Sequence, residues 1–299
     1  MTPRSSTPRA SAKRKRAAPR PAPRGARARP IETDKYALYQ RAVQLPEHEV
    51  AFCSRVFRRC FDRPALRLRE DFCGTAAVCC AWARSRPDRR AWGVDLDPEP
   101  LRWAREHNLA ALTPAQRGRV VLLQQDVCQP SRPRVDLIAA QNFSFFTFQR
   151  RDQLRAYFAR ARAQLDREGL LVLDLMGGPQ LWRDEHRETR RLGGFHYVWE
   201  QHRFDPITHR CQFSIHFRLG DGRWLRHAFR YDWRLWTIPE VRELLAEAGF
   251  ARSEVYWEGT DGATGQGNGR YRRCAQAASD PAWVAYVVGI KSSASSRPL

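Results

Sequence analysis

Long apolar runs are missing from this sequence of 299 residues. No stretch approaches the roughly 18 consecutive apolar residues that a membrane-spanning helix needs. No apolar segment follows the charges near Met1 either, as a secretory signal would require. We therefore expect no membrane partner and a cytoplasmic location. Because 42% of the residues are hydrophobic, the chain can still bury a sizeable core.

Paired cysteine motifs are missing as well. The cysteines show no C-x-x-C spacing, and no histidines accompany them at the intervals typical of zinc sites. Most lie inside apolar stretches, which favours reduced, buried thiols in a reducing compartment. We therefore expect no metal and no disulfide framework among Cys53, Cys60, Cys73, Cys79, Cys80, Cys128, Cys211 and Cys274.

Lysine is scarce among the 52 basic residues, where it occurs only at Lys13, Lys15, Lys35 and Lys291. The formal net charge is +20, but residues 1–30 hold ten of the basic residues and no acid. A uniform preference for arginine fits GC-rich coding as well as it fits selected phosphate contacts. The charge alone therefore does not indicate a nucleic-acid-binding domain.

Residues 1–30 also contain no large apolar residue after Met1. Such a segment cannot offset the entropy lost on folding, so we predict a disordered basic tail at 1–30 and a disordered C-terminus at 293–299. The Lys-Arg-Lys-Arg run at 13–16 leaves open a nucleic-acid contact or a targeting signal through this tail.

From residue 66 onward, short apolar runs alternate with segments of helical periodicity, which is typical of βαβ units and a parallel sheet. Helices are predicted over 98–108, where Asp97 precedes Pro98, and over 151–166. We expect an α/β, Rossmann-like domain over 31–292, with a mostly parallel sheet of seven strands and helices on both faces. Its first strands are predicted at 66–71, 90–95, 119–124, 135–140 and 169–175.

After residue 190 the periodicity changes to that of antiparallel strands. An antiparallel insertion is predicted over 195–232, between the fifth strand and the last helix, with strands at 195–204, 210–218 and 223–232. A capping box at Thr237 starts that helix, which ends at Gly249. Two final strands are predicted at 250–258 and 282–290, joined by a loop that includes the glycine-rich residues 265–269.

The segment 66–76 combines a strand with the tight turn Cys73-Gly74-Thr75, followed by an apolar helix. A glycine at the carboxyl end of a strand lets the backbone approach a ligand closely. Asp95 ends the second strand, 21 residues after Gly74, where a carboxylate can accept two ribose hydroxyls. Asp126 follows the third strand, where it can accept from an adenine amino group.

In order and spacing, these three segments resemble the cofactor site of class I S-adenosylmethionine-dependent methyltransferases, over residues 65–176. The resemblance implies S-adenosylmethionine as cofactor. It implies that the cofactor is bound by Glu70, Cys73, Gly74, Thr75, Asp95, Leu96, Asp126, Val127 and Asn142. Phe72 and Ala76 stand where the fuller pattern has glycines, so we expect a bulkier turn. A nicotinamide-binding domain would need three turn glycines, and this segment has one.

Candidates for the reaction side flank this region. Asn142 follows the fourth strand, where ligands of open α/β sheets bind, and Tyr36 and Tyr39 lie on a helical segment that precedes the domain. No catalytic base is identifiable. Two sets of residues have alternative roles. Phe143, Phe145, Phe146 and Phe148 form either a wall of the site or core. The inserted strands form either a pocket or a dimer interface through His196, Tyr197, Trp199, Glu200, His216, His227 and Tyr231.

The function implied by the resemblance is methyl transfer from S-adenosylmethionine to a small-molecule acceptor by in-line displacement. The aromatic segment after the fourth strand and the insertion favour this interpretation. The basic tail favours the alternatives, which are an RNA or protein methyltransferase or a non-catalytic cofactor-binding protein of the same fold. A homodimer is compatible with either.

Overall fold

The computed structural model describes residues 32–262 and 267–292. The expected disordered segments at 1–30 and 293–299, with the Lys-Arg run at 13–16, lie outside the described residues. So does part of the glycine-rich loop.

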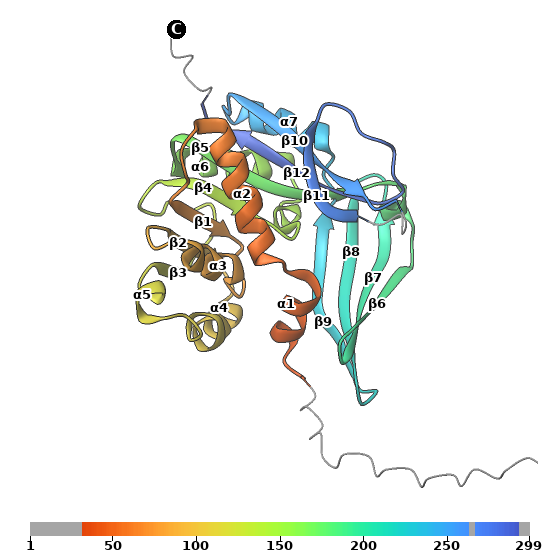
Figure 1. The fold of residues 1–299 in the computed structure, drawn as a ribbon. Coiled ribbons are helices and arrows are strands. Elements are labelled where there is room, and N and C mark those ends of the chain that lie inside the picture. Colours follow the sequence, from red (N-terminus) through yellow and green to blue (C-terminus); the bar gives the residue numbers. More distant parts are fainter. Residues whose placement is uncertain (1–31, 263–266, 293–299) are drawn as a thin grey trace, which may run out of the picture. The chain divides into compact units, whose positions relative to one another are not determined.

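The central sheet has the strand order β11-β10-β12-β5-β4-β1-β2-β3 (Figure 1). The five parallel strands predicted from the sequence are confirmed. They are β1 (Arg67–Asp71), β2 (Arg90–Asp95), β3 (Val120–Gln124), β4 (Val135–Ala140) and β5 (Leu165–Gly177). The strands β12 (Trp283–Ile290), β10 (Arg252–Thr260) and β11 (Gly267–Cys274) complete it, each antiparallel to its neighbours. The carboxyl ends of the parallel strands therefore share one edge.

The prediction of seven strands was wrong by one, because β11 makes the sheet eight-stranded. Gly267 and Gly269, expected in a loop, belong to β11. This edge strand pairs only with β10 and carries arginines at most exposed positions. It lacks the apolar alternation by which a strand is recognised from sequence. An edge strand can do without this pattern because backbone hydrogen bonds to its neighbour hold it in the sheet.

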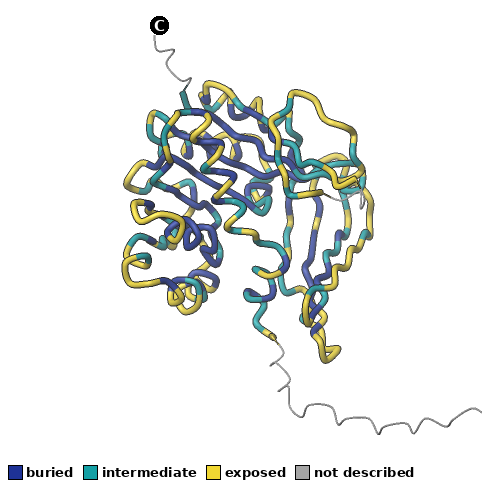
Figure 2. The backbone as a smooth tube through the Cα atoms, viewed as in Figure 1, coloured by how far each residue is buried: buried dark blue, intermediate teal, exposed yellow. Residues whose placement is uncertain are grey.

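Helices cover both faces of the sheet, as predicted. α2 (Pro46–Phe61) and α3 (Ala77–Ser85) pack in one buried cluster, and α6 (Arg151–Gln164) and α7 (Ile238–Glu247) pack in the other. Figure 2 shows the buried central strands between these layers. No helix among the described residues is long and apolar enough to cross a membrane.

Shorter helical segments surround this core. The helix predicted over 98–108 is α4 (Pro98–Ala104) followed by a π-helical turn, η1 (Arg105–Leu109). The remaining ones are α1 (Lys35–Val43), α5 (Pro114–Arg117), η2 (Ser144–Thr147) and η3 (Pro179–Trp182). All eight cysteines are free.

The insertion is a separate antiparallel sheet of four strands rather than three. It comprises β6 (His186–Leu192), β7 (Phe195–Asp205), β8 (Arg210–Leu219) and β9 (Trp224–Arg234), in that order. The predicted start at residue 195 was wrong because β6 is a mostly exposed edge strand of charged residues, without apolar alternation. It pairs with β7 from His186 to Leu192. The other edge, β9, lies next to α1 (Figure 1).

Gly93 lets the turn after β1 pack against β2. A methyl carbon at this position would lie 2.8 Å from Cys73 Sγ and 2.9 Å from Leu122 Cδ2. We expect Gly93→Ala to lower the free energy of unfolding by about 1–3 kcal/mol, the usual effect of overpacking. Denaturant titration measures this. Gly118→Ala is the matched control, because its nearest neighbouring atom is 3.5 Å away and its φ of −64° suits alanine. Equal effects of the two substitutions would contradict the packing account.

Candidate active site

The turn between β1 and α3 takes a left-handed backbone at alternate residues. The φ angles are 57° at Phe72, 50° at Gly74 and 54° at Ala76. A non-glycine residue in this region costs about 1–2 kcal/mol. Packing offsets this at Phe72, whose ring lies 5.9 Å from that of Tyr157. Although Phe72 and Ala76 replace glycines of the related pattern, all three positions have the positive φ that glycine favours.

Asp95, at the end of β2, links two turns through its carboxylate. The N–H of Gly74 donates to Oδ2 at 2.7 Å, and the N–H of Asp97 donates to Oδ1 at 3.0 Å. Burial raises the pKa of Asp95 above its usual value. Because a carboxylate offers about four acceptor sites, each oxygen can still accept one further hydrogen bond.

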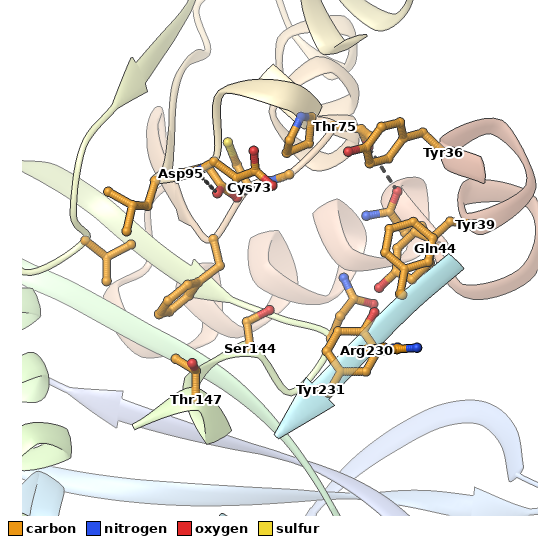
Figure 3. A pocket seen from close by; sticks show the side chains of 18 of the residues that line it. Tyr36, Tyr39, Gln44, Cys73, Thr75, Asp95, Ser144, Thr147, Arg230 and Tyr231 are labelled. Carbon is orange, nitrogen blue, oxygen red and sulfur yellow. Dashed lines mark hydrogen bonds between the residues drawn. The ribbon is translucent and has the colours of Figure 1, made fainter. Parts of the chain in front are cut away.

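These turns border a cavity of about 620 Å³ (Figure 3). Most of the residues predicted to bind cofactor or substrate line it, namely Cys73, Gly74, Thr75, Asp95, Leu96, Asp126, Val127, Asn142, Tyr36 and Tyr39. Leu96 is 69% exposed and, with Val127, provides an apolar surface beside the two carboxylates. The Asp126 carboxylate accepts from the N–H of Cys128 at 2.7 Å. The cavity therefore lies at the carboxyl edge of the sheet, where the carboxylates of Asp95 and Asp126 border it.

Glu70 does not line the cavity. Its side chain is buried, and Oε2 accepts from the N–H of Cys79 in α3 at 2.9 Å. Burial raises the pKa of Glu70 to about 7. The contribution of Glu70 visible in the structure is to anchor α3 beneath the turn; a direct cofactor contact stays a prediction.

The segment after β4 forms another wall. Asn142, Ser144 and Thr147 line the cavity, and the side-chain amide of Asn142 forms no hydrogen bond with any residue that the structure describes. The role of the phenylalanines is now clear. Phe145 and Phe146 are fully buried core residues, whereas Phe148 lines the cavity. Phe143 is partly buried and packs against the core.

α1 closes the cavity with two tyrosines. The ring of Tyr36 lies 5.8 Å from those of Trp103 and Phe229, and the ring of Tyr39 lies 4.8 Å from that of Phe229 in β9. Burial raises the pKa of both Tyr36 and Tyr39. They are therefore neutral near physiological pH.

Anchors at its N-terminus hold α1 in this position. Asp34 caps the helix and accepts from Nε1 of Trp103 at 2.6 Å, while Lys35 pairs with Glu99 at 3.0 Å. In Figure 3, Tyr36, Tyr39 and Gln44 lie across the cavity from Asp95 and Cys73. The N-terminal helix is thus part of the site.

β9 supplies the remaining wall, through residues 228–231 and Trp233. Of the inserted residues singled out from the sequence, only Tyr231 lines the cavity. The others lie within their own sheet, where His216 contacts Glu200 at 2.7 Å. A dimer interface stays untested.

The edge of β9 that is not paired with β8 also contributes to this wall. The N–H of Leu235 donates to the carbonyl of His209 at 2.9 Å, so the alternation of the ladder makes Phe213 with Tyr231 a hydrogen-bonded pair. The backbone N–H and C=O of Arg230 consequently point away from β8. On the same edge, the carbonyl of Asp232 accepts from Gln149 at 3.0 Å. Arg230 lines the cavity, where its backbone offers a donor and an acceptor.

Sequence reasoning missed several lining residues. Thr147 was within reach of it, since it closely follows Asn142. Nothing in the local sequence distinguishes Gln44, Arg230 or Trp233, which reach the cavity through tertiary packing. Among the described residues, no group of three or more His, Cys, Asp or Glu side chains is placed to hold a metal ion.

Comparison with protein-family models finds no match, and comparison with curated protein sequences finds none either. Solved structures do match. The amino pentose methyltransferase CalS10 from Micromonospora echinaspora, solved with S-adenosylmethionine bound, has a TM-score of 0.62 at 20% identity, over 89% of this chain and 100% of its own. DesVI from Streptomyces venezuelae has 0.62 at 18%, over 87% and 100%.

A third match is the sugar N-methyltransferase KedS8 from a Streptoalloteichus species. Its TM-score is 0.57 at 20% identity, over 93% of this chain and 99% of its own. At such identities the likeness shows the fold. The chain has the α/β fold of class I S-adenosylmethionine-dependent methyltransferases, as its motifs predicted.

Glu70 makes the stability of this region depend on pH. Since folding raises its pKa from 4.5 to about 7, the folded chain holds a proton that the unfolded chain releases. Stability is then lost as pH rises through this interval. Relative to wild type, Glu70→Gln should gain about 1.4 kcal/mol of unfolding free energy per unit of pKa shift between about pH 5 and about pH 8. Denaturant titrations at several pH values measure this, with the exposed Glu47→Gln as control. A pH-independent difference between Glu70→Gln and wild type would refute it.

Proposed function

We propose that this chain transfers the methyl group of S-adenosylmethionine to a nitrogen atom of a small polar acceptor. One observation carries the proposal. The Asp95 carboxylate, bonded to the N–H of Gly74, borders the same cavity that α1 and β9 close from the other side. Cofactor groups and acceptor groups would then share one cavity.

The residues present suit the cofactor. The free acceptor sites of Asp95 match ribose hydroxyls, and Leu96 and Val127 offer apolar surface for a base, with Asp126 beside it. A volume of about 620 Å³ lies within the range of about 300–1,000 Å³ that is usual for ligand sites. The left-handed turn at residues 72–76 brings the backbone to the cavity.

When bound, S-adenosylmethionine supplies a methyl group already activated by its positive sulfur. The residues of the chain then have to align the acceptor with this group and exclude water. The aromatic side chains of Phe148, Tyr39 and Tyr231 line the cavity, and aromatic faces attract a positive charge. The walls formed by α1 and β9 would limit the access of solvent to the reacting atoms.

The acceptor side favours nitrogen as the acceptor atom. Among its polar groups are Tyr39, Tyr231, Asn142 and Ser144, and burial raises the pKa of both tyrosines, which leaves no base among these four. A neutral amine attacks through its own lone pair, whereas a hydroxyl would have to lose a proton. As the C–N bond forms the C–S bond breaks, and the proton of the resulting ammonium group passes to solvent.

The matched proteins are consistent with this choice, since CalS10 is described as an amino pentose methyltransferase and KedS8 as a sugar N-methyltransferase. The Arg230 backbone adds a donor and an acceptor that suit hydroxyl or amide groups of a polar acceptor. A cytoplasmic location stays a prediction, as does nucleic-acid binding through residues 1–30.

Calorimetric titration with S-adenosylhomocysteine tests the cofactor site. Asp95→Asn preserves the shape of the side chain but removes its charge and one acceptor oxygen, so binding should weaken about tenfold to hundredfold. Asp88→Asn is the control, because Asp88 is exposed and, among the residues that the structure describes, forms a salt bridge only with Arg86. Unchanged affinity of Asp95→Asn, or no binding to the wild type, would refute the proposed site.

Incubation with methyl-labelled cofactor tests the acceptor class. We expect label on small amines, amino sugars in particular, and none on the matching alcohols. The rate should rise with pH as the amine loses its proton. A chain without residues 1–30 should retain this activity. Transfer to alcohols alone, or to RNA in a manner that needs residues 1–30, would contradict the proposal.

A further inference from the structure

Asp174 is a buried acid that the proposed reaction does not use. It is the only charged residue in the apolar run 170–176 of β5, and it is 8% exposed. It forms no ion pair with any lysine or arginine that the structure describes. A buried carboxylate without a cation is costly unless hydrogen bonds compensate for its lost hydration.

The compensating bonds come from the segment after β4. The N–H of Asn142 donates to Oδ2 at 2.8 Å, and the N–H of Phe143 donates to Oδ1 at 2.9 Å. Both oxygens are therefore acceptors. An ionised carboxylate meets this requirement fully, whereas a protonated carboxyl or an asparagine would present a donor in place of one acceptor.

The bonded segment is itself strained. Asn142 and Phe143 have φ angles of 56° and 58°, and two successive non-glycine residues rarely take this left-handed conformation. Strain of this kind persists only where the surroundings hold it. Immediately after it, Ser144 begins η2, and Asn142 and Ser144 line the cavity.

We propose that Asp174 is a positioning residue, whose ionised carboxylate holds Asn142 and Phe143 in this turn so that Asn142 and Ser144 face the acceptor. The identity of what the cavity binds rests on the proposed function. The stabilisation of the turn by the Asp174 carboxylate does not, because it involves only residues of this chain.

The surroundings of Asp174 determine how pH affects this hold. Glu49 of α2, Tyr39 of α1, Tyr271 of β11 and Tyr286 of β12 are the titratable groups that face it. Burial raises the pKa of each tyrosine, so none ionises near neutrality. Burial also raises the pKa of Asp174 to about 7 and that of Glu49 to about 8. Protonation of Asp174 below about pH 7 would weaken the turn.

Kinetics of Asp174→Asn in the full chain test the inference. We expect kcat to fall on the order of 100-fold, as a misplacement of about 1 Å can cause, while affinity for S-adenosylhomocysteine changes by less than about threefold. With an acceptor amine whose own pKa lies well away from 7, the wild-type limb of kcat near pH 7 should disappear in Asp174→Asn and persist in Glu49→Gln. Equal losses of kcat and cofactor affinity would mean general structural damage and overturn the assignment. So would persistence of the limb in Asp174→Asn.

Amide hydrogen exchange gives a readout that needs no methyl transfer. In Asp174→Asn, the amides of Asn142 and Phe143 should exchange at least about tenfold faster, while those of β4 stay protected. Unchanged exchange would refute the hold on the turn, even in an active enzyme. Faster exchange in a protein that does not bind S-adenosylhomocysteine would retain the hold and reject the proposed function.

A glycine at position 143 provides a second test by the same readout. Glycine takes the left-handed conformation without penalty, so the turn should depend less on the carboxylate. Asp174→Asn should accelerate exchange of the Asn142 amide less in the Phe143→Gly background than in the wild type. Equal acceleration in both backgrounds would show that the carboxylate does not offset strain at Phe143.

Discussion

Carboxylates that accept from backbone N–H groups hold the carboxyl edge of the central sheet together. At this edge the chain leaves each parallel strand in a tight turn, whose N–H groups no longer pair within the sheet. Asp95 accepts from Gly74 and Asp97, Asp126 from Cys128, Glu70 from Cys79, and Asp174 from Asn142 and Phe143. The bonds to Gly74, Asn142 and Phe143 tie turns to the side chains of neighbouring strands, so these turns keep a fixed shape beside an open cavity.

This arrangement has an electrostatic consequence. Burial raises the pKa values of Glu70, Asp95 and Asp174, so the acids that shape the site also make it sensitive to pH. Asp95 differs from the other two in lining the cavity. Carboxylates bonded to backbone N–H groups thus have two roles. Asp95 is available to a ligand, whereas Glu70 and Asp174 support the walls of the cavity.

The sequence predicted this edge better than it predicted the periphery. The five parallel strands are apolar runs between helices of clear periodicity, and Asp95 and Asp126 directly follow two of them. The edge strands β6 and β11 carry charged residues on both sides, so no alternation revealed them. The role of Asp174 could not be predicted, because its bonds join residues that lie 31 and 32 positions apart in the sequence.

The acceptor half could be predicted only in part, through Asn142, Tyr36, Tyr39 and Tyr231, because its parts come from distant segments. α1 and β9 are separated by most of the chain, yet Tyr36 and Tyr39 both pack against Phe229. The order of motifs along the sequence carries no information about such contacts. The fold is shared with methyltransferases at about 20% identity, so the acceptor has to be inferred from the side chains of this chain.

A crystal structure with S-adenosylhomocysteine tests the central claim most directly. The account predicts that the ribose hydroxyls bond to the carboxylate of Asp95, with the base beside Leu96 and Val127 and the sulfur directed toward the wall formed by Asn142, Tyr39 and Tyr231. A ligand bound elsewhere, or one whose sulfur faces away from this wall, would contradict it.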